Sequence, residues 1–98
     1  MTTPEKTMSI LLVDDEEEFA STLAERLRLR GYEARAVFDG ESALALLEQG
    51  APEKGKPRNG GPADVDLVLL DMLLPGIHGS ELVRRILDLR PGLPVILL

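Results

Sequence analysis

The sequence predicts an α/β domain in which a doubly wound parallel sheet is covered by helices on both faces. Short runs of branched apolar residues alternate with stretches whose apolar residues recur every three or four positions, which indicates strand–helix–strand units. Acidic residues directly follow two of the apolar runs. The chain has 98 residues, 44% of them hydrophobic, which is enough for one core and too few for two. We therefore expect a single domain.

The first predicted strand covers residues 10–13, and a helix follows it. The strand, ILLV, is apolar throughout, which is typical of a strand buried on both faces. It stops at Asp14 and Asp15, and the acids that continue to Glu18 favour the start of a helix because the helix dipole is positive there. The helix should end before Gly31. Its expected inward residues are Phe19, Ala20, Leu23, Ala24 and Leu27.

The second strand and second helix are predicted over residues 32–37 and 41–49. Polar and apolar residues alternate in the strand, which indicates a position nearer the edge of the sheet. Asp39 and Gly40 end the strand, and Gly50 closes the helix. The residues of this helix expected to face inward are Ala43, Leu44, Leu46 and Leu47.

Two segments show no apolar periodicity. Residues 1–8 are polar, and we expect them to form a disordered leader. Residues 51–63, APEKGKPRNGGPA, contain three prolines, three glycines and three basic residues, so we predict a flexible surface loop. A basic docking loop is the alternative interpretation, and a solvated linker is favoured over it.

The remaining elements are a third strand over residues 67–70, a helix over about residues 80–89 and a fourth strand over residues 94–98. A turn at Pro75 separates the third strand from the helix. The fourth segment, PVILL, has the composition of a buried strand. The apolar face of the helix consists of Leu82, Val83, Ile86, Leu87 and Leu89.

Three carboxylates follow predicted strands and form the candidate site. Asp14 and Asp15 follow the first strand, and Asp71 follows the third. In a doubly wound sheet the binding crevice lies at the carboxyl ends of the strands, where the winding reverses. If the strand order is 2-1-3-4, the three carboxylates converge there, and their mutual repulsion favours a hard cation such as Mg²⁺. With a cation present, Asp71 is best placed to act as a nucleophile toward phosphorus.

Each candidate also has a structural interpretation. Asp14 and Asp15 alone could cap the first helix, and Asp71 alone could cap a turn. Only the joint arrangement argues for a site. His78, the single histidine, lies on a turn between glycines and is expected to be a surface residue and not a phosphoryl relay. Glu16 could reach the crevice through a water molecule.

Composition excludes several other functions. The formal net charge of −6 disfavours direct binding of nucleic acid, and an aromatic content of 3% offers no stacking platform for bases. No apolar run approaches the roughly 20 residues of a membrane span, so no membrane association is expected. The absence of cysteine excludes disulfides and Cys-ligated metals and is compatible with the cytoplasm, the default location.

The motifs together resemble the receiver domain of bacterial response regulators, the phosphorylation target of two-component signalling. The resemblance covers residues 9–98 and lies in ILLVDDE, the Gly31-Tyr32 junction, DGESAL and DLVLLDMLLPGIHG. It implies a flavodoxin-like sheet with Asp71 as phosphoacceptor. It also implies Mg²⁺ bound directly by Asp15, mainly through water by Asp14, and by the backbone carbonyl of Leu73. The phosphoryl group would come from a sensor histidine kinase, a phosphotransfer protein or a small phosphodonor, and the domain would not be a turnover enzyme.

Receivers carry a Ser or Thr after the fourth strand and a Lys after the fifth, and these positions lie beyond Leu98. We therefore expect an incomplete receiver that lacks the fifth strand and the last helices, with impaired phosphoryl transfer and switching. The fourth strand would be an edge with unpaired backbone groups. Either the chain is a fragment of a longer receiver, or two chains form a homodimer through this edge.

Two other functions are weighed against the phosphoacceptor. A receiver-like interaction module without the switch stays open. An aspartyl-phosphate phosphohydrolase is less favoured because such enzymes show DxDx(T/V) after the first strand, where this chain reads Asp14-Asp15-Glu16-Glu17. Nucleotide binding would need a Gly-rich loop at the same place, and the sequence has none there.

Overall fold

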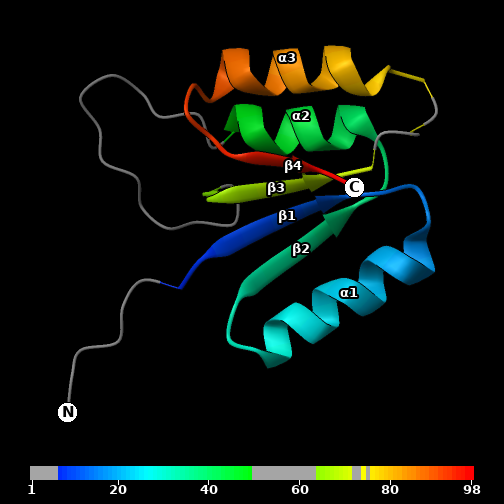
Figure 1. Cartoon of the computed structure of the whole chain (residues 1–98), viewed down its shortest axis with the longest axis vertical. Coiled ribbons are helices and arrows are strands. Elements are labelled where there is room, and N and C mark those ends of the chain that lie inside the picture. Colours follow the sequence, from blue (N-terminus) through cyan, green and yellow to red (C-terminus); the bar gives the residue numbers. More distant parts are fainter. Residues whose placement is uncertain (1–6, 50–63, 72–73, 75) are drawn as a thin grey trace.

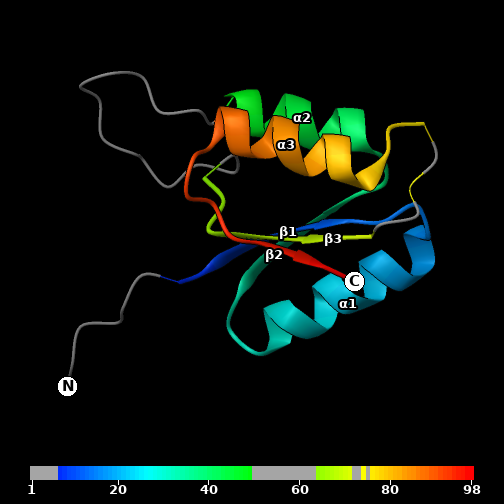
Figure 2. The same ribbon diagram turned by 45° about the horizontal axis from the view of Figure 1, so that its top comes forward.

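The strands form one parallel sheet in the order β2-β1-β3-β4, with α1 on one face and α2 and α3 on the other (Figures 1 and 2). The computed structural model describes residues 7–49, 64–71, 74 and 76–98. The strands are β1 (Ser9–Val13), β2 (Glu33–Val37), β3 (Leu67–Leu70) and β4 (Val95–Leu97). The helices are α1 (Glu17–Leu29), α2 (Gly40–Gln49) and α3 (Gly79–Leu89). The predicted α/β class and strand order are confirmed.

The predicted boundaries agree with the structure to within a residue. β3 covers the predicted residues 67–70, and the predicted ends of the other strands differ by one residue at most. Gly31 ends α1 as expected, with a φ of 97° that L side chains rarely adopt. The predicted loop over residues 51–63 lies outside the described residues, and so does the predicted leader apart from Thr7 and Met8.

β1 is one of the two interior strands, and its end is level with the ends of its two neighbours. Val13 pairs with Val37 of β2 and with Leu70 of β3. Because helices cover both faces of β1, Leu11 and Val13 are fully buried. The residues that follow β1 and β3 therefore emerge at the same edge of the sheet.

The core is divided by the sheet into two parts. The larger part lies under α2 and α3, where Leu47, Leu82 and Ile86 are fully buried. The smaller part lies under α1, where Ala24 packs with Leu12 and Ala34. No helix among the described residues is both long enough and apolar enough to cross a membrane.

The inward position predicted for Phe19 is wrong, since its side chain is 50% exposed. The residues of α1 that are fully buried are Ala20 and Ala24. These small side chains let the helix lie close to the sheet. Successive helical residues point about 100° apart, and Phe19 directly precedes the buried Ala20. Phe19 therefore points away from the line of contact.

The edge position expected for the fourth strand is confirmed, whereas its buried-type composition is not matched by burial. Ile96 and Leu97 are 48% and 46% exposed, and Leu98 is 57% exposed. β4 is an edge strand that pairs with β3 alone among the described strands. In α3, Leu87 was expected to face inward but is 41% exposed. Leu82 and Ile86 form the buried line of that helix instead.

Candidate acidic site at the carboxyl ends of the strands

The backbone of the candidate site is held by hydrogen bonds that extend the sheet beyond its strands. The amide of Asp71 donates to the carbonyl oxygen of Val13 over 2.9 Å. The amide of Asp14 donates to the carbonyl oxygen of Val37 over 3.1 Å. Because neighbouring parallel strands end in register here, the apolar runs that form β1 and β3 deliver both aspartates to one crevice.

The three predicted aspartates lie together. A carboxylate oxygen from each of Asp14, Asp15 and Asp71 can be chosen so that all three lie within 4.8 Å of one another. Asp14 is buried, Asp71 is half-buried and Asp15 is exposed. Three like charges at this separation repel one another, and a divalent cation relieves the repulsion. Carboxylate oxygens are the ligands that Mg²⁺ and Ca²⁺ prefer.

Asp14 also shapes the turn into α1. Its Oδ1 accepts a hydrogen bond from the amide of Glu16 over 2.9 Å. The residue at the N-cap of α1 is Glu16, whose side chain makes no capping bond. Asp14 is therefore not the N-cap of α1, and its side chain stabilises only the turn that leads into the helix. An ionised carboxylate offers about four acceptor positions, so Asp14 retains acceptor capacity for a cation.

An open, acidic hollow lies at the start of α1, whose first residues follow Asp14 and Asp15 in the chain. It is lined by Glu16, Glu17, Glu18, Phe19 and Thr22. All of these side chains are exposed. The hollow carries the carboxylates of Glu16, Glu17 and Glu18 and presents one aromatic ring to solvent.

Other predicted residues take structural or surface positions. His78 is exposed at the N-cap of α3, and its side chain makes no capping bond, in agreement with the surface interpretation. The backbone carbonyl of Leu73 and the turn residue Pro75 lie outside the described residues.

The capping role of Asp39 was missed by the sequence analysis, which treated this residue as the end of a strand. Its Oδ1 accepts from the amide of Ser42 over 2.7 Å, and its Oδ2 accepts from the Ser42 hydroxyl over 3.0 Å. The backbone bond, followed by the hydroxyl bond, lowers the pKa of the Asp39 carboxyl. An Asp just before a run of helix-forming residues is the signal that could have identified it.

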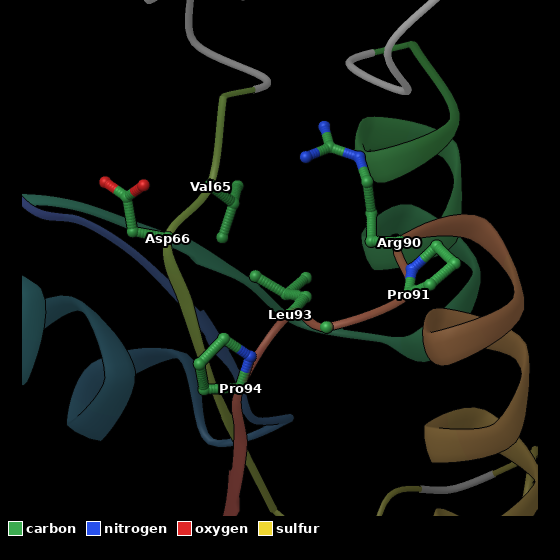
Figure 3. A pocket seen from close by; sticks show the side chains of 7 residues that line it. Val65, Asp66, Arg90, Pro91, Leu93 and Pro94 are labelled. Atoms are coloured by element: carbon green, nitrogen blue, oxygen red, sulfur yellow. The ribbon is translucent and has the colours of Figure 1, made fainter.

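A second concavity lies away from the aspartates, at the edge where β3 and β4 begin (Figure 3). Its volume is about 230 Å³. It is lined by Val65, Asp66, Arg90, Pro91, Gly92, Leu93 and Pro94. Figure 3 shows the Asp66 carboxylate pointing away from Arg90. One oxygen of this carboxylate accepts from the amide of Ser9 over 2.9 Å, which ties the beginnings of β1 and β3 together.

Comparisons with known proteins bear on the family and the fold of the chain. A family model described as the response regulator receiver domain matches residues 10–98. The chain is 42% identical over 89 residues to the sensory transduction protein RegX3 of Mycolicibacterium smegmatis, a match that covers 91% of this chain and 33% of that protein. The chain thus spans about a third of the length of the curated relatives it matches.

Two solved structures extend the comparison to the fold. The receiver domain of the hybrid histidine kinase CckA superposes with a TM-score of 0.73 at 35% identity, covering 91% of this chain and 72% of that one. The response regulator TrrA of Thermotoga maritima superposes with a TM-score of 0.73 at 33% identity, covering 93% and 68%. The TrrA structure is a complex with Mg²⁺–BeF.

Proposed function

Because the chain belongs to the response regulator receiver domain family, we propose that it is a phosphoacceptor of two-component signalling and that Asp71 is the residue phosphorylated. The observation that carries this proposal is the convergence of Asp71 with Asp14 and Asp15 at the carboxyl ends of β1 and β3. Asp71 is half-buried, so a donor can reach it, and its backbone is bonded to Val13, so its position is set by the sheet.

The donor set fits a magnesium ion. The carboxylates of Asp14, Asp15 and Asp71 bring oxygens within 4.8 Å of one another, and carboxylate oxygens are ligands that Mg²⁺ prefers. Asp15 would bind the ion directly, Asp14 mainly through water, and the carbonyl of Leu73 would complete the protein ligands. The ion supplies positive charge that neutralises the carboxylates and the phosphoryl oxygens.

Asp71 acts as the nucleophile in this proposal. One of its carboxylate oxygens forms a bond to phosphorus as the bond between phosphorus and the donor's histidine nitrogen breaks. The histidine returns to its donor protein, and a later attack by water on phosphorus releases phosphate and restores Asp71. The chain catalyses at most its own phosphorylation and dephosphorylation, and it turns over no separate substrate.

The proposed partners follow from the same chemistry. A sensor histidine kinase or a phosphotransfer protein supplies the phosphoryl group in the cytoplasm, and residues 9–98 form the receiver unit. The net charge of −6 weighs against direct contact with nucleic acid.

The test is chemical phosphorylation of the 98-residue chain. The protein is incubated with Mg²⁺ and acetyl phosphate, and its intact mass is measured. We expect the wild type to gain one phosphoryl group and Asp71→Asn to gain none. Asp88→Asn is the matched control, because Asp88 is an exposed acid on α3, outside the cluster. A phosphoryl group that still appears on Asp71→Asn would rule out Asp71 as the acceptor.

A second candidate function is an interaction module that keeps the receiver shape without the switch. It is favoured by the exposed apolar edge of β4, where Ile96, Leu97 and Leu98 face solvent. The amide of Leu98 and the carbonyl of Pro94 bond to β3, so by alternation the polar backbone groups of Val95 and Leu97 point outward. A second copy of the chain could pair with these groups to form a homodimer. A chain that dimerises but is not phosphorylated would favour this function.

A further inference from the structure

Gly40 differs from the turn glycines of the described chain. Gly31, Gly76 and Gly92 have positive φ, and a Cβ on any of them would meet nothing within 4 Å. Gly40 is buried at the first residue of α2, and no positive φ requires a glycine there. A Cβ built on it would lie 2.6 Å from Cγ2 of Ile77 and 3.1 Å from Cδ2 of Leu82. Glycine is therefore needed for space, since an alanine would otherwise favour the helix.

The start of α2 cannot retreat from this contact. Asp39 caps the helix through its bonds to Ser42, and Ala43 and Leu47 are fully buried in the core beneath it. This contact is part of the packing of α2 against α3, and the two helices begin at the same end of the sheet (Figures 1 and 2). A side chain added at position 40 must therefore displace its neighbours.

Of these two neighbours, Ile77 is the one that an added side chain at position 40 would displace. Leu82 is fully buried, and its amide is bonded to the carbonyl oxygen of His78 over 2.9 Å. Ile77 is only half-buried and precedes α3. Its Cγ2 is attached directly to a branched Cβ whose χ1 is stiff, so it cannot swing away as the tip of a flexible side chain would. The backbone at Ile77 has to move.

Ile77 belongs to the segment that joins Asp71 to α3. We propose that Gly40 is a positioning residue for the Asp71 site, because its missing side chain lets Ile77, six residues after Asp71 in the chain, pack against the start of α2. The inference rests on the proposed role of Asp71 and adds α2 to the elements that support it. Displacement of a reacting group by about 1 Å can lower a rate by up to about 10²-fold.

The test is a mutant cycle in the 98-residue chain. Gly40→Ala, Ile77→Ala and the double variant are compared for the rate of phosphorylation by acetyl phosphate and for Mg²⁺ affinity by isothermal titration calorimetry. We expect Gly40→Ala to slow phosphorylation about tenfold or more and to weaken Mg²⁺ binding. Because Ile77→Ala removes the obstructing methyl, the double variant should phosphorylate within about threefold of Ile77→Ala.

The control is Ala45→Gly, an exchange of the same two residue types at an exposed position of α2. It destabilises the helix by about 1 kcal/mol through propensity alone and should leave the phosphorylation rate unchanged. A rate loss of similar size in this control would show that the effect comes from stability and would overturn the proposal. So would a wild-type rate in Gly40→Ala, or a loss that Ile77→Ala fails to rescue.

Two outcomes separate this proposal from the one it rests on. If the wild type is not phosphorylated on Asp71, the proposed function fails and the positioning role fails with it. If the wild type is phosphorylated and Gly40→Ala behaves identically, only the positioning role fails. Should Gly40→Ala not fold, a folded and active double variant supports the proposal, and a double variant that also does not fold overturns it.

Discussion

Neutralising one aspartate of the acidic cluster should stabilise the chain in the absence of metal. Two unit charges 4.8 Å apart repel by about 0.9 kcal/mol in bulk water and by about 3.5 kcal/mol at an effective dielectric constant of 20. Asp15 is exposed, so the lower value applies to it, and it faces both Asp14 and Asp71. Asp15→Asn should therefore raise the free energy of unfolding by about 1–2 kcal/mol.

The expected change is large enough to measure by thermal denaturation. For a domain of this size about 1 kcal/mol shifts Tm by about 4–8 °C. The assay is circular dichroism in a metal-free, low-salt buffer, with Asp88→Asn as a control that removes one exposed charge outside the cluster. About 1 M salt shortens the screening length to about 3 Å and should shrink the gain.

The response to Mg²⁺ completes this prediction. A ligand at 100 times its Kd stabilises the folded state by about 2.7 kcal/mol, so Mg²⁺ should raise the Tm of the wild type and of Asp88→Asn. Asp15→Asn should gain much less, because it weakens the proposed direct ligand of the ion. Repulsion within the cluster is ruled out if metal-free Asp15→Asn melts at or below the wild-type Tm. Mg²⁺ binding at the cluster is ruled out if Mg²⁺ raises the Tm of Asp15→Asn as much as that of the wild type.

Two further predictions concern the cap of α2 and the edge of the sheet. Asp39→Ala should lower the free energy of unfolding at pH 7 by about 1 kcal/mol, because the amide and hydroxyl of Ser42 lose their acceptor. The pKa of Asp39 is lowered from 3.8 in the folded state, so the stability lost in Asp39→Ala should be complete above pH 3.8 and should shrink as the pH falls through the pKa of the folded state. Thermal denaturation at pH 7 and at about pH 3 measures this change. Asp39→Asn should keep most of the capping stabilisation at both pH values. A loss of stability in Asp39→Ala that is as large in acid as at pH 7 would contradict the capping role of the Asp39 carboxylate. Ile96→Lys, which places a charge on the exposed edge strand, should abolish self-association measured by light scattering, and a wild type that is monomeric at every concentration would contradict the homodimer.

The sheet and the acidic cluster were predictable because both depend on short-range patterns. The apolar runs that became β1 and β3 are long enough to identify as strands, and each is followed directly by an aspartate. Parallel pairing then brings Asp14 and Asp71 together without any information about side-chain packing. The motifs around these residues also identified the family.

The errors concern contacts that no local pattern encodes. Periodicity shows that α1 has an apolar face, but the closeness permitted by Ala20 and Ala24 decides that Phe19 is left outside. The composition of β4 indicated burial, and its exposure followed instead from the edge position expected for it in the strand order. The steric role of Gly40 depends on Ile77, which lies 37 positions away in the sequence.

The bonds from the amides of Asp14 and Asp71 to neighbouring strands have a consequence for how the acidic site is acquired. A metal site built on a free loop forms by a search separate from folding, and the ion itself must order the chain. Here the two amides are anchored by the same ladder that joins β1 to β2 and β3, so the backbone on which the carboxylates stand is assembled in the cooperative step that makes the sheet. When a cation binds, only the side-chain rotamers of these residues have to adjust. A change that unfolds the sheet would therefore also remove the backbone framework of the acidic site.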